Sequence, residues 1–317
     1  MRTVFLGTSE FAATVLERLA VSDHSPTLVL TRPDRPRGRG RRMAAPPVAE
    51  HARALGIALE QPERVNETPV VEQIARVEPD AVVVCAFGAL IKEPLLSACE
   101  ILNVHPSLLP RWRGAAPIER ALLAGDERTG VSIMRLTAGL DSGPVCLTAA
   151  EPIAPEDTYG SLAPRLARIG GELLVRALDL SAAGGHPAFA EQDEAGVTYA
   201  EKIAPADRLL DPARPAAELE RVVRALHPHI GARVPLADGQ FLGVLRARVT
   251  ADGDPDGEEP GIREIQPGAL AAVGGPPTRL LYGAGDRPLE LLEVQPPGGR
   301  AMDADAYLRG HGQTLSR

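Results

Sequence analysis

The first 31 residues, MRTVFLGTSEFAATVLERLAVSDHSPTLVLT, contain two short apolar runs with an amphipathic stretch between them. The runs Thr3–Gly7 and Thr27–Thr31 are rich in Val and Leu, which is typical of strands buried on both faces. Between them, Phe11–Leu19 carries apolar residues at the spacing of a helix. This order predicts a βαβ unit and therefore a parallel sheet.

The same alternation continues to about residue 150. Four further runs are expected to be strands: Ala81–Ala86, Ile101–His105, Gly130–Leu136 and Val145–Ala149. Four further stretches are expected to be helices: Val48–Leu55, Thr68–Val77, Pro94–Ala98 and Ala116–Leu123. Apolar positions from Leu162 to Leu173 predict one more helix packed on the sheet. Residues 1–188 are thus predicted to form an α/β domain with a doubly wound, mostly parallel, Rossmann-like sheet.

The chain changes character after Ser181, where a small-residue and polar stretch begins. We interpret residues 189–205 as a linker and residues 206–317 as a second domain. One helix is expected there at Ala216–Leu226. Short strands are expected at Phe241–Val249, Ala269–Val273, Thr278–Tyr282 and Leu289–Val294. This pattern favours a small, OB-like β-barrel, with the acidic Gly- and Pro-rich stretch Ala251–Gly261 as a mobile loop.

Composition excludes several classes of protein. The chain has 317 residues, 44% of them hydrophobic and 24% charged, with a net charge of -8, so a disordered chain is excluded. No apolar run approaches the ~18 residues of a membrane span, and the start lacks a signal-peptide pattern, so we expect a cytoplasmic protein that does not enter membranes. Cys85, Cys99 and Cys146 form neither a disulfide framework nor a zinc motif, and no metal is expected. We expect a monomer.

One segment departs sharply from the acidic average. Residues 32–42, RPDRPRGRGRR, contain six arginines and one aspartate. Arginine suits phosphate groups because its planar guanidinium donates in a fork. A run of arginines can equally be a solvated segment without a ligand. Its glycines and prolines make the segment too irregular for a helix, so we expect it to become ordered only on binding a polyanion.

The candidate chemistry lies at the carboxyl ends of the predicted strands. Neither G-x-G-x-x-G nor G-x-x-x-x-G-K-[ST] occurs, so nucleotide-cofactor functions lose their usual support. Asn103 and His105 end the run Ile101–His105 and, being two residues apart, project from the same face. An amide that stabilises an oxyanion beside an imidazole that moves a proton suits acyl transfer. A histidine after a strand can also be purely structural.

Two motifs resolve that choice. Asn103–Ile118, NVHPSLLPRWRGAAPI, and Gly139–Gly143, GLDSG, resemble the signatures of the 10-formyltetrahydrofolate-dependent formyltransferases. The resemblance implies that Asn103, His105 and Asp141 are catalytic, without a metal or a covalent intermediate. It also implies folate-binding residues in two loops: Ser107, Leu108, Leu109 and Pro110 in one, and Ala86, Phe87, Gly88 and Leu90, whose backbone would hold the pterin, in the other.

The acceptor is indicated by features outside these signatures. The sequence after His105 resembles the purine-pathway members, which usually have one domain. Residues 32–42, Trp112–Ile118 and Leu291–Met302 instead resemble the members that formylate tRNA. That likeness implies transfer of the formyl group of 10-formyltetrahydrofolate to the α-amine of initiator methionyl-tRNA, for translation initiation. It further implies tRNA contact by Arg35, Arg37, Arg39, Arg41 and Arg42, and it implies that the second domain, residues 206–317, binds tRNA.

Two alternatives stay open at this point. A sugar-nucleotide N-formyltransferase of the same fold would bind a uridine or thymidine nucleotide and would not respond to tRNA. A folate- or RNA-binding regulator that retained the fold would transfer nothing. The presence of Asn103, His105 and Asp141 together argues against the regulator.

Overall fold

A computed structural model describes residues 1–37, 40–185, 187–250, 265–275 and 278–311. The chain forms two compact units that are not contiguous in sequence. The first unit comprises Met1–Pro117, Arg128–Pro152 and Leu162–Ala200, and the second comprises Ile118–Glu127, Ile153–Ser161 and the chain from Glu201 onward. The boundaries expected at 188 and 205 stay a prediction. Within the described residues, no helix is both long and apolar enough to cross a bilayer.

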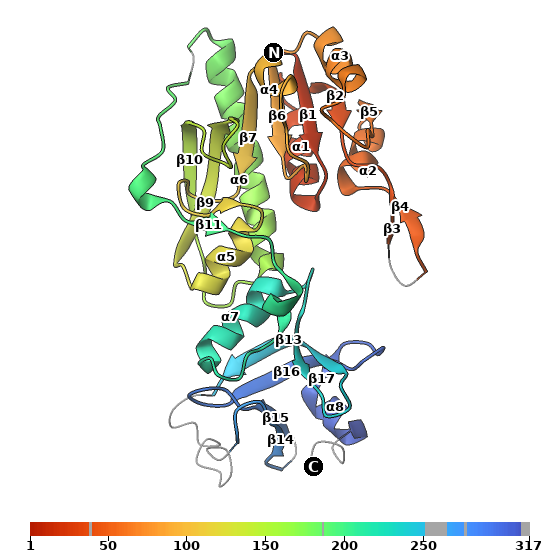
Figure 1. The fold of residues 1–317 in the computed structure, drawn as a ribbon, viewed down its shortest axis with the longest axis vertical. Coiled ribbons are helices and arrows are strands. Elements are labelled where there is room, and N and C mark those ends of the chain that lie inside the picture. Colours follow the sequence, from red (N-terminus) through yellow and green to blue (C-terminus); the bar gives the residue numbers. More distant parts are fainter. Residues whose placement is uncertain (38–39, 186, 251–264, 276–277, 312–317) are drawn as a thin grey trace. The chain divides into compact units, whose positions relative to one another are not determined.

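The first unit is built on a seven-stranded sheet with the order β10-β9-β7-β6-β1-β2-β5. Its strands are β1 Thr3–Gly7, β2 Pro26–Leu30, β5 Ala58–Glu60, β6 Ala81–Cys85, β7 Ile101–His105, β9 Arg128–Arg135 and β10 Val145–Pro152. The five strands from β7 to β5 pair in parallel, while β9 and β10 pair antiparallel. The doubly wound, mostly parallel sheet predicted from the sequence is confirmed (Figure 1).

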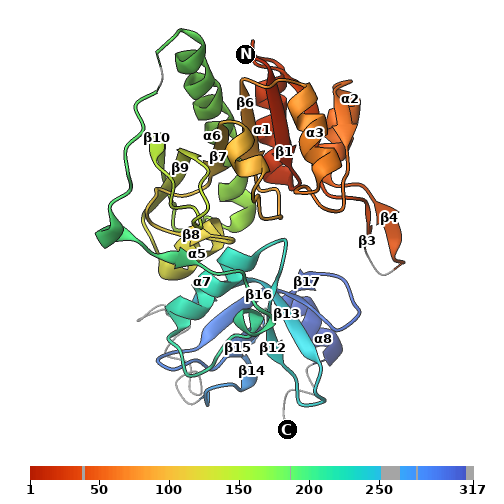
Figure 2. The same ribbon diagram turned by 45° about the horizontal axis from the view of Figure 1, so that its top comes forward.

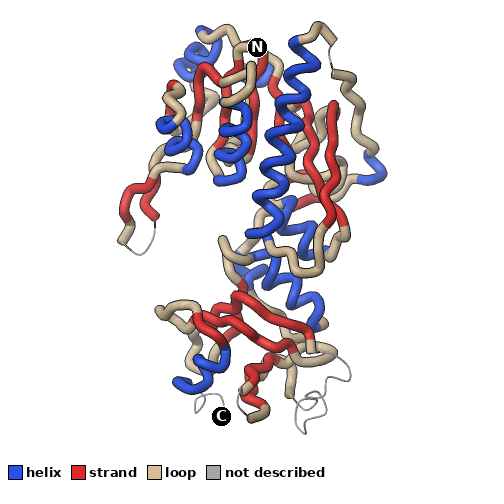
Figure 3. Tube along the Cα trace, turned by 180° about the vertical axis from the view of Figure 1, so that it is seen from behind, coloured by secondary structure: helices blue, strands red, loops and turns tan. Residues whose placement is uncertain are grey.

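Helices cover both faces of this sheet. They are α1 Glu10–Ala20, α2 Pro47–Ala54, α3 Thr68–Arg76, α4 Leu95–Ala98 and α6 Tyr159–Ala182. On one face, Gly170 of α6 lies against Val104 of β7, and Gly171 lies against Arg18 of α1. Figure 3 shows the long helix α6 across that face. On the other face, Ile74 of α3 and Leu95 of α4 pack onto alternate residues of β1, β2 and β6 in one apolar core.

Strand β1 is the point where the direction of winding changes. The chain runs from β1 outward to β2 and β5, then returns to the other side of β1 with β6 and β7. In open α/β sheets, ligands bind beyond the carboxyl ends of the strands at such a switch point. The loops after β1, β6 and β7 are therefore the place to look for a site.

Short pairs of strands were not predicted. β3 Arg35–Arg37 and β4 Arg42–Ala44 form an antiparallel pair, so the expectation that the segment is ordered only on binding a polyanion is wrong for these residues. The side chain of Gln61 explains this order, because it donates to Arg32 O at 3.0 Å and to Asp34 Oδ1 at 2.8 Å. β8 Arg113–Gly114 pairs in parallel with β11 Tyr199–Ala200.

The second unit contains an antiparallel sheet with the order β12-β13-β16-β15-β14, with β17 paired to β16. The strands are β12 Ala232–Pro235, β13 Phe241–Val249, β14 Leu270–Val273, β15 Arg279–Tyr282, β16 Leu289–Gln295 and β17 Met302–Asp303. The unit also holds α5 Pro117–Ala124, of which all but the first residue belongs to it, α7 Ala216–Leu226 and α8 Ala304–His311. The sequence predicted a small, OB-like β-barrel for this domain, and the structure has an antiparallel half-barrel sheet (Figure 2).

Its core lies between α7 and the sheet. Leu219, Val222, Val223 and Leu226 of α7 are almost fully buried against residues such as Tyr282. The predicted bounds of α7, Ala216–Leu226, match the structure. The expected mobile loop Ala251–Gly261 lies outside the described residues.

Candidate active site

Asn103 and His105 end β7, the third strand from the β10 edge of the sheet. Their side chains share one face because they are two residues apart, while Val104 between them faces α6. Asn103 is 8% and His105 4% exposed. The strand therefore places an amide and an imidazole, both nearly buried, at the carboxyl edge of the sheet.

Asp141 reaches the same place from the turn between β9 and β10. Its Oδ1 accepts a hydrogen bond from Asn103 Nδ2 at 3.3 Å, and its Oδ2 lies 3.7 Å from His105 Nδ1. The backbone N–H of Gly114 donates to Oδ2 at 2.8 Å. The structure thus brings together the three residues that were predicted to be catalytic.

The turn that carries Asp141 is tightly constrained. Asp141 has a φ of +44°, a left-handed conformation that is uncommon outside glycine. Gly143 must be glycine, because a Cβ there would overlap with the carbonyl oxygen of Arg135. Strained backbone of this kind persists only where its surroundings hold it in place.

The partner of the imidazole Nε2 fixes the tautomer of His105. Nε2 lies 2.9 Å from the carbonyl oxygen of Trp112. Because a carbonyl oxygen only accepts, Nε2 carries the proton and donates it to this bond. In the neutral ring, Nδ1 then presents a lone pair, and its 3.7 Å separation from Asp141 Oδ2 is longer than a hydrogen bond. Nδ1 is accordingly the nitrogen able to take up a proton.

The loop after β7 is held by two serine hydroxyls. Ser107 is fully buried, and its Oγ donates to Arg111 O at 2.6 Å. Ser132 of β9 donates to Ser107 O at 2.7 Å and accepts from Leu109 N at 3.1 Å. Leu108, Leu109 and Pro110 are half-buried. Ser107 thus shapes the loop, and the three residues after it form its accessible surface.

The loop after β6 lies at the same edge of the sheet, because β6 and β7 are parallel neighbours. Phe87 is 3% exposed and anchors this loop in the core, whereas Leu90 is 62% exposed. Thr8, which follows β1, donates to Phe87 O at 2.8 Å, and Asn66 Nδ2 donates to Leu90 O at 2.8 Å. Ala86 and Gly88 adopt positive φ and are exposed. The eight residues predicted to bind folate therefore flank the carboxyl ends of two adjacent strands.

Comparison with known proteins accounts for this arrangement. A family model described as formyl transferase matches residues 1–178, and one described as formyl transferase, C-terminal domain, matches residues 202–312. The chain belongs to the formyl transferase family.

Relatives of this formyl transferase match along nearly its whole length. A methionyl-tRNA formyltransferase of Halorhodospira halophila is 45% identical, over 98% of this chain and 96% of that protein. A methionyl-tRNA formyltransferase of Symbiobacterium thermophilum is 42% identical, over 98% of this chain and 93% of that protein. Among solved structures, an N-formyltransferase of Helicobacter canadensis in complex with folinic acid and dTDP-3-aminofucose shares the fold, with a TM-score of 0.63, 13% identity and coverage of 91% and 98%.

Part of the segment predicted to be a linker belongs to the site of this formyl transferase. Thr198 Oγ1 accepts from Trp112 N at 2.9 Å, and Thr198 O accepts from Arg113 N at 2.9 Å. Ala200 O accepts from Ala115 N at 2.8 Å, and Gly114 is glycine because a Cβ there would overlap with that carbonyl. The segment thereby holds the turn that supplies the partners of His105 and Asp141. The sequence gives no sign of this, because Thr198 is far from the site in the chain.

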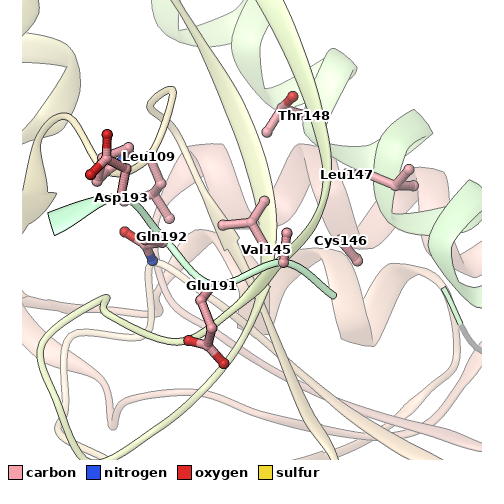
Figure 4. A pocket seen from close by; sticks show the side chains of 10 residues that line it. Leu109, Val145, Cys146, Leu147, Thr148, Glu191, Gln192 and Asp193 are labelled. Atoms are coloured by element: carbon pink, nitrogen blue, oxygen red, sulfur yellow. The ribbon is translucent and has the colours of Figure 1, made fainter. Parts of the chain in front are cut away.

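The same segment closes a pocket at the edge of the sheet (Figure 4). The pocket is lined by Val145–Thr148 of β10, by Ala190–Asp193 and by Leu109 and Pro110. Ala190 forms an antiparallel bridge with Val145, so this part of the segment adds to the edge strand.

The predicted tRNA-binding arginines lie on and beside the β3–β4 pair. Arg35 pairs with Glu63, with 2.6 Å between Nη2 and Oε2, which ties the base of the pair to the segment after β5. Arg41 and Arg42 are exposed, as is Met43. Arg37 belongs to β3, and Arg39 lies outside the described residues.

The three cysteines are free, and Cys85 is fully buried. Burial raises the pKa of Cys85, and burial raises the pKa of the half-buried Cys146 to about 11. Both therefore stay protonated at neutral pH. In the part of the chain that the structure describes, no three His, Cys, Asp or Glu residues gather as metal ligands would.

Proposed function

We propose that this formyl transferase moves the formyl group of 10-formyltetrahydrofolate to the α-amine of the methionine carried by initiator tRNA. The observation that carries the proposal is the convergence of Asn103, His105 and Asp141 at the carboxyl edge of β7. The identity of 42–45% with methionyl-tRNA formyltransferases over nearly the whole chain supports the choice of acceptor.

Asn103 is assigned to the formyl oxygen, on which negative charge develops during attack. Its Nδ2 has two hydrogens, and one is directed to Asp141 Oδ1. The second is available to the oxygen. A donor placed in this way typically contributes ~10²–10³ in rate.

His105 is assigned to proton movement. An α-amine has a pKa of ~7.7–8, so much of it is already the neutral nucleophile near pH 7.5 and no strong base is required. Nδ1 of His105 accepts the proton that the amine loses on attack and returns it to the leaving nitrogen of the folate. The positive charge that the ring gains in between is stabilised by Asp141 Oδ2, 3.7 Å away. Proton transfer of this kind contributes ~10²–10⁴ in rate.

The folate is assigned to the loops after β6 and β7. 10-Formyltetrahydrofolate supplies the electrophilic formyl carbon. The exposed backbone at Ala86 and Gly88 suits the polar edge of a pterin, and Leu90 with Leu108–Pro110 offers apolar surface to its rings. These residues fit a planar, polar-edged ligand, and none of these steps needs a metal.

The tRNA is assigned to the β3–β4 pair. Arg41 and Arg42 are exposed at the start of β4, and Gln61 and Glu63 contact Arg32 and Arg35, before and at the start of β3. A residue already held in a strand pair, such as Arg42, loses less conformational entropy on contacting a phosphate than a residue of an unpaired segment would. We assign Arg41 and Arg42 to the tRNA acceptor region on this basis, and Arg35, Arg37 and Arg39 on the resemblance of residues 32–42 to the members that formylate tRNA.

The test is a transfer assay with three acceptors. Initiator methionyl-tRNA, the same tRNA without methionine, and a thymidine-diphosphate amino sugar are each incubated with 10-formyltetrahydrofolate. Formylation of the methionyl-tRNA alone is expected. Formylation of the amino sugar instead would establish the sugar-nucleotide alternative.

A further inference from the structure

Both polar atoms of the Gln192 side chain form hydrogen bonds with other residues of the protein. Its Nε2 donates to Asp141 O at 2.8 Å and to Gly143 O at 2.7 Å, and its Oε1 accepts from Arg113 Nε at 3.0 Å. It lies in the segment before β11 and lines the pocket of Figure 4. The sequence did not single it out.

The orientation of the amide is determined by these partners. The reverse orientation would place Oε1 against two carbonyl oxygens and the amide hydrogens against a guanidinium group. Only the observed orientation satisfies all three partners. The contact is therefore specific for a side chain that donates at one end and accepts at the other.

The partners of Gln192 lie on both sides of the Asp141 carboxylate. Two of them are the main chain of the turn that carries Asp141, in which Asp141 adopts a φ of +44°. The third is Arg113, which directly precedes Gly114, and Gly114 N donates to Asp141 Oδ2. Gln192 thus joins the backbone of Asp141 to the strand that holds its side chain.

Arg113 makes this junction rigid. It is 3% exposed, and its Nη2 donates to Glu194 Oε1 at 2.9 Å. Because Gln192 and Glu194 belong to the same segment, one guanidinium group is held by two residues of that segment. The position of Gln192 relative to β8 is therefore fixed.

We propose that Gln192 is a positioning residue for formyl transfer: it fixes the Asp141 turn so that the carboxylate faces Nδ1 of His105. It acts through Asp141, because the polar atoms of its side chain bond to the Asp141 turn and to Arg113. This inference rests on the proposed function, in which Asp141 stabilises the charge on His105.

The test is the substitution Gln192→Glu, which keeps the size of the side chain and removes both donors. The new carboxylate accepts from Arg113 but is repelled by the carbonyls of Asp141 and Gly143. We expect kcat to fall ~10–100-fold, because a displacement of ~1 Å can cost ~10²-fold. KM for each substrate should stay within about 3-fold, since the substitution keeps the size of a side chain whose polar atoms bond to the Asp141 turn and Arg113.

A pH profile separates positioning from a general loss of structure. On protonation, the carboxyl group in Gln192→Glu regains one O–H donor for a carbonyl. Its kcat relative to the unsubstituted enzyme should therefore rise as pH falls toward the ~4.3 of an ordinary glutamate. Gln192→Met, which lacks both donor and acceptor at every pH, should lose kcat without this recovery.

Glu201→Gln is the matched control, because Glu201 is an exposed residue of the segment 189–205 that does not line the pocket of Figure 4. It should keep the activity of the unsubstituted enzyme. If the unsubstituted enzyme does not formylate methionyl-tRNA, the proposed function has failed. If it does, and Gln192→Glu retains kcat within about 2-fold, the positioning role is overturned. Failure of both Gln192 variants to fold would also overturn it, by making Gln192 a determinant of folding.

Discussion

Asp141 is the residue on which the local geometry of the site depends. Its two carboxylate oxygens accept from Asn103 and Gly114. In Asp141→Asn the new amide must turn an N–H toward one of those donors, whichever way it lies. We expect kcat to fall on the order of 10²-fold in the transfer assay, with KM for folate nearly unchanged. Asp23→Asn, at an exposed position, is the control, and an equal loss in both variants would remove Asp141 from the mechanism.

Cys85, at the end of β6, makes the free energy of unfolding depend on pH in the alkaline range. Burial raises its pKa above the ~8.5 of an exposed cysteine. Its contribution to stability is therefore complete below about pH 8.5 and is lost as pH rises toward the folded-state value. Above about pH 9, the free energy of unfolding of the native chain should fall by ~1.4 kcal/mol per pH unit more than that of Cys85→Ala. Urea titrations at several pH values measure this, and parallel curves would contradict it.

At the level of elements, the β3–β4 pair is expected to act on tRNA alone. Replacing Arg41 and Arg42 by Ala should weaken tRNA binding and flatten its dependence on salt, by ~0.9 in slope for each lost phosphate contact. Folate affinity should not change. Arg64→Ala with Arg76→Ala removes two exposed arginines from elsewhere in the first unit as a control. Equal losses of both ligands in the Arg41 and Arg42 variant would indicate that the pair supports the fold.

The strands of the first unit were predictable because a strand buried on both faces is a continuous apolar run in the sequence, and the helices were predictable from the spacing of their apolar residues. Val82–Val84 of β6 is a continuous apolar run of this kind, and the α7 pattern gave both of its ends correctly. Asn103, His105 and Asp141 were found from motifs. Side chains such as Ser132, Thr198 and Gln192 were missed, because each acts through contacts with residues distant in sequence, and such contacts leave no periodic pattern. The order of the β3–β4 pair was missed for the same reason, since it depends on Gln61.

At the level of the whole molecule, each of the two compact units is built from segments that are not contiguous in sequence. Residues 118–127 and 153–161 lie before the predicted linker but belong to the second unit. Leu123 packs against the core around α7, Glu119 Oε1 lies 3.0 Å from His229 Nε2, and Asp157 O accepts from Arg224 at 2.9 Å. A cut near Ala204 therefore removes the packing partners of two segments that remain in the fragment.

The consequence can be measured by hydrogen exchange on a fragment of residues 1–204. Its central strands β1 and β6 should remain protected, because the helices that pack on them are all retained. Residues 118–124 should exchange much faster than in the full chain, because α5 loses Leu123's contacts and a helix of eight residues is not stable in water without packing. The fragment should still bind folate, since the two loops assigned to folate lie in the first unit. Transfer to methionyl-tRNA should fall, because only Ala115 and Ala116 separate Trp112–Gly114 from α5, and an unanchored α5 leaves the partners of His105 and Asp141 less well held. Unchanged protection of residues 118–124 in the fragment would mean that α5 is stabilised by the first unit instead.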